Sequence, residues 1–260
     1  KLYGEEERFD DQIAVLNAII KINPTNEGAQ SDLARAYELS GRDPLDVYKK
    51  RFDNNPDNIS YGLDYAEKLL SGDRPDDAAK VLKQVVAADP SSKVAYRKLA
   101  EAYDKDDRLA DAAKTYERLF RLDPRDFRVA VKIVDVYIEE QDYKSAFDWA
   151  DKAVTISGEG EALGAKGNVY YKAFQACRTG EISVDDRVVA TLAFNLFSDA
   201  EKSGFSRYSR SKDWLKENEV LFGKPQWFMM DATVKNRGYV KAGSSCYSWV
   251  SERLDKGKGW

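Results

Sequence analysis

Apolar residues recur at three- and four-residue steps along most of the chain, and short polar turns interrupt them at regular intervals. This spacing places the apolar side chains on one face of an α-helix, so it predicts a succession of amphipathic helices. Four proline-bearing dipeptides mark turns that are 32, 34 and 34 residues apart: Asn23-Pro24, Asn55-Pro56, Asp89-Pro90 and Asp123-Pro124. Each period has room for two helices, which predicts a repeat protein built of helix pairs.

Small residues occupy two fixed positions in the period. In residues 93–126, counted as positions 1 to 34, Ala100 falls at position 8 and Ala112 at position 20. A methyl side chain lets two antiparallel helices approach until the ridges of one fit the grooves of the other. Bulky residues fill the space around these positions, and a proline at position 32 helps to end the second helix: Leu99, Tyr103, Tyr116, Leu119 and Pro124. This pattern resembles that of the tetratricopeptide repeat family. The resemblance implies an all-α, right-handed superhelical solenoid of antiparallel helix pairs.

The same pattern divides most of the chain into units. Residues 8–22 resemble a second helix whose first helix we expect before Lys1, so the N-terminus looks trimmed. The units that follow span about residues 27–58, 59–92, 93–126, 127–160 and 161–203, which places helical repeats in residues 1–205. Residues 206–260 are predicted to form a capping helix, over 206–222, and a small irregular or β-hairpin tail. The hairpin would turn at Asn236-Arg237-Gly238.

Composition limits the chemistry that the chain can perform. Its 260 residues include 41 Lys and Arg against 45 Asp and Glu, a net charge of -4, so it lacks the overall positive charge of most nucleic-acid-binding proteins. It contains no histidine, which removes Ser-His-Asp and Cys-His catalytic groups and histidine-ligated zinc. The many carboxylates and lysines fit the polar faces of helices. We therefore expect no enzyme, no cofactor, no metal site and no nucleic-acid partner.

The sequence also bears on location and cysteine chemistry. No apolar run approaches the roughly 18 to 20 residues that a membrane helix requires, and the first residues do not resemble a signal peptide. We expect a soluble protein without direct membrane insertion, in the cytoplasm or the periplasm. Cys177 and Cys246 lie 69 residues apart, which suits neither a metal site nor a dense disulfide framework. We expect two ordinary thiols rather than a single disulfide.

A glycine-rich stretch resembles a dinucleotide-binding loop. Gly158, Gly160 and Gly164 follow the apolar residues 153–156, but a phosphate-binding loop requires a strand at that place. The repeat register places residues 153–156 at the end of a second helix. We therefore interpret the glycines as a turn between helices.

The family resemblance also indicates a binding surface. Solenoids bind partners on the concave face, and the resemblance implies that six positions of each first helix line it. The residues that we expect there are Arg97, Lys98, Glu101, Arg128, Lys132, Asp135, Asn168 and Tyr171. Arg128 and Lys132 share one helix face and, with the basic pair at 97 and 98, would form a basic patch for a carboxylate-bearing peptide. The alternative is that these cations are solvated and pair with neighbouring Asp and Glu.

Two further features refine this surface. Chaperone-binding members of the family hold a carboxylate with Lys, Asn and Arg from three consecutive first helices, but Leu63 and Glu67 stand where the first helix would supply Lys and Asn. We therefore expect no full clamp. Exposed aromatic candidates either cover an edge of the last helices or form a docking patch: Tyr171, Trp227, Phe228, Tyr239, Tyr247 and Trp249.

The expected function is that of a non-catalytic protein-protein interaction scaffold that binds a peptide or a partner helix on the concave face. Two other functions remain open, a regulatory module detached from a larger enzyme and a homo-oligomerisation module. The arrangement resembles bacterial tetratricopeptide proteins attached to larger assemblies, and a likeness of fold does not establish function. The sequence encodes neither the partner's identity nor the oligomeric state.

Overall fold

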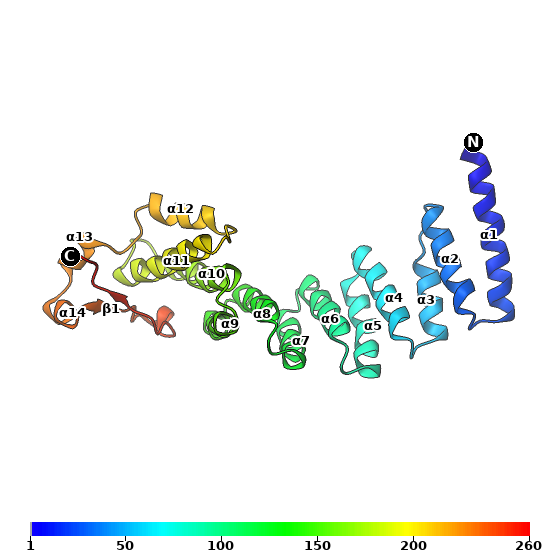
Figure 1. Ribbon diagram of the computed structural model, residues 1–260, viewed down its shortest axis with the longest axis horizontal. Coiled ribbons are helices and arrows are strands. Elements are labelled where there is room, and N and C mark those ends of the chain that lie inside the picture. Colours follow the sequence, from blue (N-terminus) through cyan, green and yellow to red (C-terminus); the bar gives the residue numbers. More distant parts are fainter. Residues whose placement is uncertain (1) are drawn as a thin grey trace. The chain divides into compact units, whose positions relative to one another are not determined.

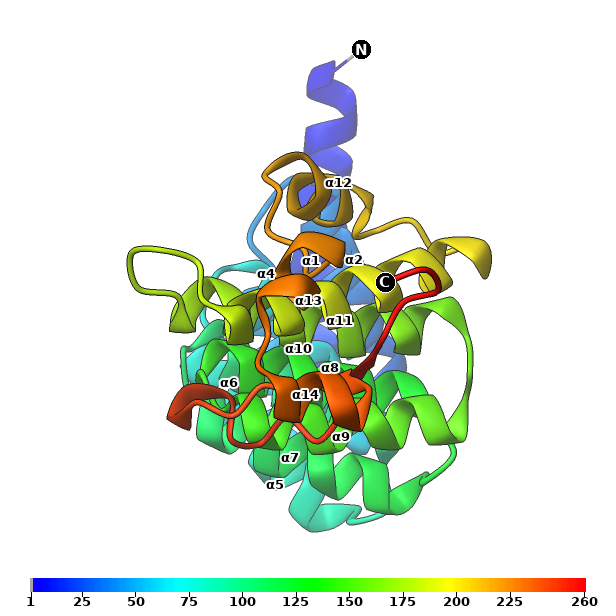
Figure 2. The same cartoon turned by 90° about the vertical axis from the view of Figure 1, so that its left-hand side faces the viewer.

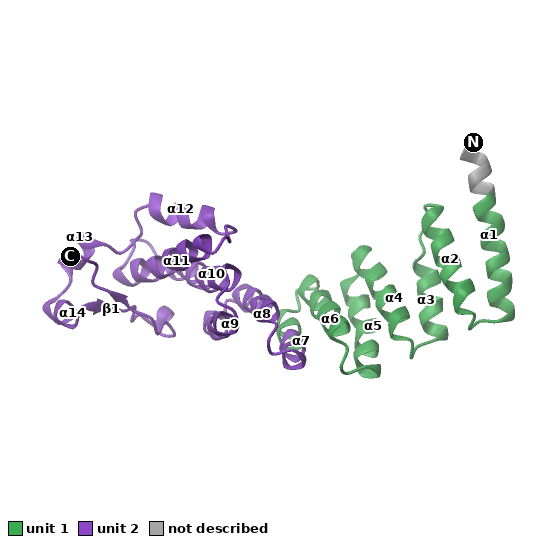
Figure 3. Cartoon of the chain, viewed as in Figure 1, with its two compact units in different colours: residues 1–115 green, residues 116–260 purple. Residues whose placement is uncertain are grey.

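The computed structural model describes residues 2–260, and the side chains of residues 8–260. Helices dominate, and two short strands near the C-terminus make the only sheet within this described part of the chain. The chain divides into two compact units, residues 1–115 and 116–260 (Figure 3). The boundary between the units falls within one helix, α7 (Leu109–Leu122).

Unit 1 is a series of helices that follow one another along the chain and pack against their neighbours (Figure 1). Its helices before α7 are α1 (Leu2–Ile22), α2 (Glu27–Leu39), α3 (Leu45–Asn54), α4 (Ile59–Ser71), α5 (Pro75–Ala88) and α6 (Lys93–Lys105). The first helix of each predicted pair begins at a capping side chain, because Asn26, Asn58 and Ser92 each accept a hydrogen bond from a backbone N–H in the first turn. These caps fix where the paired helices start.

Unit 2 continues the pairs with α8 (Phe127–Glu139) and α9 (Tyr143–Ile156), and then α10 (Gly160–Cys177) and α11 (Val184–Lys202). The capping helix that we predicted over 206–222 is shorter, α12 (Ser209–Glu217). α10 and α11 are the longest pair, and their facing sides are almost entirely apolar. Among the described residues, no helix combines the length and the apolar character that crossing a bilayer demands.

Small residues lie where the repeat pattern predicted them. Ala66 and Ala78 in the repeat 59–92, and Ala100 and Ala112 in the repeat 93–126, are completely buried. The repeat 127–160 has Val134 in the first of these positions, and it is buried as well. The all-α fold of stacked helix pairs is therefore confirmed.

The tail after residue 223 differs from the predicted hairpin. Its elements are α13 (Lys224–Met229), α14 (Ala232–Arg237), β1 (Tyr239–Val240), a 3-10 turn (Ser245–Tyr247) and β2 (Leu254–Asp255). The prediction of a hairpin turn at residues 236–238 is wrong. Gly238, at φ +78°, ends α14, and β1 pairs antiparallel with the distant β2. Pro225 in the first turn of α13 and the Asp231 cap of α14 favour short helices over a strand.

The tail is tied to the last helix pair by a disulfide and by hydrogen bonds. Cys177 at the end of α10 is bonded to Cys246, with their Cα atoms 6.0 Å apart, so the prediction of two thiols is wrong. The buried Tyr247 hydroxyl donates to Asp186 of α11 at 2.6 Å, and Asp185 accepts hydrogen bonds from two tail N–H groups. Burial and the hydrogen bond to Asp186 raise the pKa of Tyr247. Spacing along the chain gave no sign of this proximity, because the tail folds back onto α10 and α11.

Candidate functional site

The first helices of unit 2 form a continuous surface, which we call the α8–α10 surface. α8 starts at Asp126, whose carboxylate accepts hydrogen bonds from the N–H groups of Arg128 and Val129. The apolar side of α8, including Val129 and Ile133, is buried, whereas Arg128 and Lys132 are exposed. α8 also contacts α10, so outward residues of the two helices belong to one surface.

The two exposed cations of α8 differ in their partners. Arg128 Nε lies 3.2 Å from Glu161 Oε2, and another guanidinium nitrogen lies 3.9 Å from Glu159. The Arg128 side chain is 65% exposed, so solvent screens both interactions and each contributes little stability. Lys132 forms no ion pair with any described residue. The alternative of paired, solvated cations therefore holds for Arg128 and not for Lys132.

The remaining predicted residues of unit 2 lie closer to the packed interior. Asp135 on α8 is half-buried near Tyr208; burial first, and the carboxylate of Asp135 second, raise the pKa of Tyr208 to about 12. Asn168 and Tyr171 on α10 are also half-buried. The Tyr171 ring makes edge contacts with Phe197 at 6.1 Å and with Trp214 at 6.5 Å, measured between ring centroids. Tyr171 thus serves packing of α10 against α11 and α12 as much as it serves the surface.

A shallow depression of about 400 Å3 adjoins this surface at the start of α10. Arg128, Glu159 and Glu161 line one part of it, and the loop at 203–205 lines the rest. It combines one guanidinium, two carboxylates and the ring of Phe205. This mixture suits a polar peptide segment rather than a purely apolar ligand.

The glycine stretch has a packing role beside this depression. α9 precedes it, so the interpretation as a turn between helices is confirmed for Gly158. Gly160 and Gly164 lie within α10. A Cβ added at Gly160 would come 2.7 Å from the carbonyl oxygen of Ala200, and one added at Gly164 would come 2.9 Å from the ring of Phe205. These two glycines therefore allow a close approach of α10 to α11 and the following loop.

In unit 1 the predicted residues Arg97, Lys98 and Glu101 lie on α6 and are half-buried. Lys98 Nζ is 2.7 Å from Glu67 Oε2 on α4, and this hydrogen bond lowers the pKa of Glu67. Lys68 on α4 makes a similar pair with Glu38 on α2 at 2.6 Å. Ion pairs thus connect successive first helices. Glu67, which breaks the clamp pattern, is one of their acceptors.

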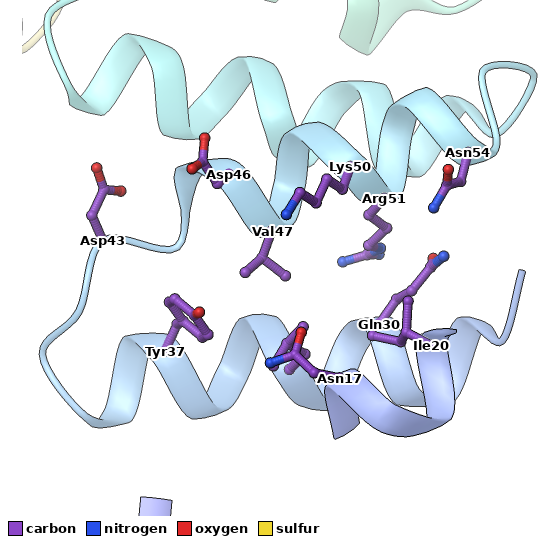
Figure 4. A pocket seen from close by; sticks show the side chains of 11 residues that line it. Asn17, Ile20, Gln30, Tyr37, Asp43, Asp46, Val47, Lys50, Arg51 and Asn54 are labelled. Atoms are coloured by element: carbon purple, nitrogen blue, oxygen red, sulfur yellow. The ribbon is translucent and has the colours of Figure 1, made fainter. Parts of the chain in front are cut away.

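A cavity that sequence reasoning missed lies between α1, α2 and α3 (Figure 4). It measures about 160 Å3, and its lining includes the apolar Leu33 and Val47 and the cations Lys50 and Arg51. The Arg51 guanidinium lies 3.8 Å from the ring centroid of Tyr61 and pairs with Asp64 at 3.2 Å, while its Nε has no hydrogen-bond partner among the described residues. The signal in the sequence is the short second helix of this pair, since α3 has ten residues and α2 has thirteen.

The aromatic candidates at the C-terminus separate into two groups. Trp227 and Tyr247 are buried, and Trp249 stacks on Tyr170 with ring centroids 5.7 Å apart. These side chains cover the edge of the last helices, which is one of the two outcomes that we expected. Phe228 is 58% exposed, and its neighbour Met229, which was not among the candidates, is 87% exposed.

Stacked helix pairs with small residues at fixed buried positions define an α-helical repeat protein. Residues 69–131 match the sequence profile described as tetratricopeptide repeat. This stretch carries the tetratricopeptide repeat pattern, and the chain has the fold of tetratricopeptide repeat proteins.

Two solved structures with TM-scores above 0.5 share this fold. "Crystal structure of MamA protein" is 21% identical with a TM-score of 0.54, covering 70% of this chain and 92% of that one. "Crystal structure of MamA" is 21% identical with a TM-score of 0.52, covering 66% of this chain and 94% of that one. "Crystal structure of YrrB: a TPR protein with an unusual peptide-binding site" is 13% identical with a TM-score of 0.49, covering 73% and 97%. No curated protein sequence matches the chain.

Proposed function

We propose that this chain is a non-catalytic scaffold that binds a protein or peptide along its first helices. In unit 2 the contacts are Arg128 and Lys132, with Asp135, Asn168 and Tyr171 around them. In unit 1 the corresponding contacts are Arg97, Lys98 and Glu101. The ligand that suits the two exposed cations of α8 is a peptide segment that carries carboxylates.

One observation carries the proposal: Lys132 is exposed, makes no ion pair with a described residue, and lies one helical turn from the exposed Arg128. A carboxylate placed between them would meet two cations. Because Arg128 holds Glu159 and Glu161 only at the solvent-exposed surface, exchanging these partners for a ligand carboxylate costs little. Such surface charges act mainly on specificity and on the rate of association.

The depression beside Arg128 would receive the adjoining part of the ligand. Glu159 and Glu161 on its wall attract a basic residue of the partner, as Arg128 and Lys132 attract an acidic one. A peptide with mixed charges would therefore bind in one direction and not in the other. In unit 1 the pairs Lys98–Glu67 and Lys68–Glu38 link successive first helices, and the first of them orients Lys98 on the surface that the ligand would contact.

The test is charge reversal on α8. The full chain would be used as bait in an extract of the source cell, the captured protein identified, and its dissociation constant measured with purified components. We expect R128E/K132E to weaken that binding at least about tenfold, since each reversed contact costs on the order of 1 kcal/mol. Circular dichroism of the variant would report whether it folds like the wild type.

The chain offers a matched control on a second helix. Lys114 and Arg118 on α7 are also exposed, four residues apart and without an ion pair to a described residue. K114E/R118E therefore changes the net charge by the same amount without touching a first helix. An equal loss of affinity in both variants would mean that overall charge, and not the α8–α10 surface, causes the effect. Unchanged binding by R128E/K132E would mean that the partner binds at another site.

A further inference from the structure

The C-terminal segment 224–260, which we call the basic tail, has a charge opposite to that of the remaining chain. It contains seven Lys and Arg and three Asp and Glu, a net charge of +4, whereas residues 1–223 contain 34 and 42, a net charge of -8. All seven cations are exposed. This asymmetry within one chain points to an anionic partner for the tail.

The acidic residues of the basic tail have partners of their own. Glu252 is half-buried and lies 2.9 Å from Lys166 of α10, and Asp255 lies 3.1 Å from Arg253. The third, Asp231, accepts the hydrogen bond that starts α14. These interactions leave the positive charge of the other tail cations uncompensated within the tail.

Two apolar side chains project from this basic segment. Phe228 and Met229 end α13, with exposed fractions of 58% and 87%. The helix is anchored through Trp227, which is buried in the apolar core of unit 2 and packs against Trp260 with ring centroids 6.0 Å apart. α13 and α14 lie together with the C-terminus at one end of unit 2 (Figures 1 and 2). The outward direction of Phe228 and Met229 is thus set by the fold.

Lysines flank these apolar side chains on both sides. Lys224 Nζ lies 5.9 Å from the ring centroid of Phe228, and Lys235 Nζ donates a hydrogen bond to the Phe228 carbonyl oxygen at 2.8 Å. Basic residues with projecting aromatic and aliphatic side chains are typical of segments that lie in a membrane interface. There the ammonium groups meet lipid phosphates while the apolar side chains enter the boundary with the acyl chains.

We propose that the basic tail docks this protein on an anionic lipid surface, with Phe228 and Met229 entering the interface and Lys224 and Lys235 contacting the headgroups. A folded protein partner would need roughly 800 Å2 of complementary surface on each side, and two isolated apolar side chains provide little of it. A bilayer requires no matching shape. The docking element lies on α13 and α14, so it is separate from the α8–α10 surface and independent of the proposed function.

The experiment is vesicle co-sedimentation of the full chain. We expect it to sediment with vesicles of phosphatidylcholine and phosphatidylglycerol, and not with vesicles of phosphatidylcholine alone. F228S/M229S should lower the partition coefficient at least about tenfold, because burial of either side chain is lost. K224Q/K235Q should lower it about twenty-five-fold, since each basic residue near an anionic surface contributes about fivefold. Added salt should weaken binding of the wild type.

Matched controls use exposed residues elsewhere. L39S/V94S removes two other exposed apolar side chains, and K114Q/R118Q removes two other cations; neither should change the partition. Circular dichroism would show that all variants fold alike. The proposal is overturned if the wild type binds neither vesicle or both equally, or if a control variant loses as much as the tail variants. It is also overturned if polyglutamate binds as tightly as the vesicles. The same holds if sedimentation velocity shows a dimer for the wild type and a monomer for F228S/M229S.

Discussion

The disulfide between Cys177 and Cys246 should supply a large part of the stability of unit 2. The bond closes a loop with a sequence separation of 69, which contains α11, α12, α13, α14 and β1. In the chain-entropy treatment, a cross-link across a loop of this length destabilises the unfolded state by about 4 kcal/mol at 25 °C. For a protein of this size, 1 kcal/mol corresponds to roughly 2 to 4 °C in Tm. We therefore expect C177S/C246S to melt about 10 °C below the oxidised wild type.

The assay is thermal unfolding followed by circular dichroism. The oxidised wild type, the reduced wild type and C177S/C246S would be compared, and the two forms without the bond should melt together. A reductant added to C177S/C246S is the control, and it should change nothing. Thiol titration in denaturant should find no free thiol in the oxidised protein. If the double variant melted within about 2 °C of the oxidised wild type, the entropic reasoning would be refuted.

Two further predictions concern the repeats. G160A should destabilise the protein by about 1 to 3 kcal/mol, although alanine is the better helix former, because its Cβ meets the backbone oxygen of Ala200. G158A is the control and should be neutral, since its Cβ meets nothing within 4 Å. The urea midpoints of the two variants and the wild type would be compared. Hydrogen bonds from Lys68 and Lys98 lower the pKa of Glu38 and of Glu67 below their ordinary 4.5, so their stabilisation is present above that pH and is lost as the pH falls through the folded pKa values. The urea midpoint of the wild type should accordingly decrease as the pH is lowered below about 4.5. The decrease should be smaller in K68M/K98M, and equal decreases in the two proteins would contradict this assignment.

Local patterns predicted the repeats well because the forces that form them are local. Residues 161–177 and 184–203 were expected to be helices, and the structure has Gly160–Cys177 and Val184–Lys202. The period of apolar residues and the capping side chains act within a few residues, so they can be read from the chain. Buried alanines at fixed positions then follow from the contact between neighbouring helices.

The tail could not be predicted in this way. The partner strands β1 and β2 have two residues each, and residues 241–253 separate them, so no alternation along the chain marks the pair. The disulfide depends on the tail folding back onto α10, which is a property of the packed structure. The cavity near Arg51 likewise depends on how α1, α2 and α3 pack together.

The tail covers the apolar face of the last helix pair, which in an open stack of helices would otherwise be exposed to water. Trp227 and Tyr247 cover that face from the tail, and the bond between Cys177 and Cys246 holds the cover in place. Covering requires only the inward side chains, so the outward side of the tail is unconstrained by packing. Phe228 and Met229 nevertheless lie on that side between two lysines, where polar residues would cost little in stability. Their position is better explained by a contact outside the chain than by the fold.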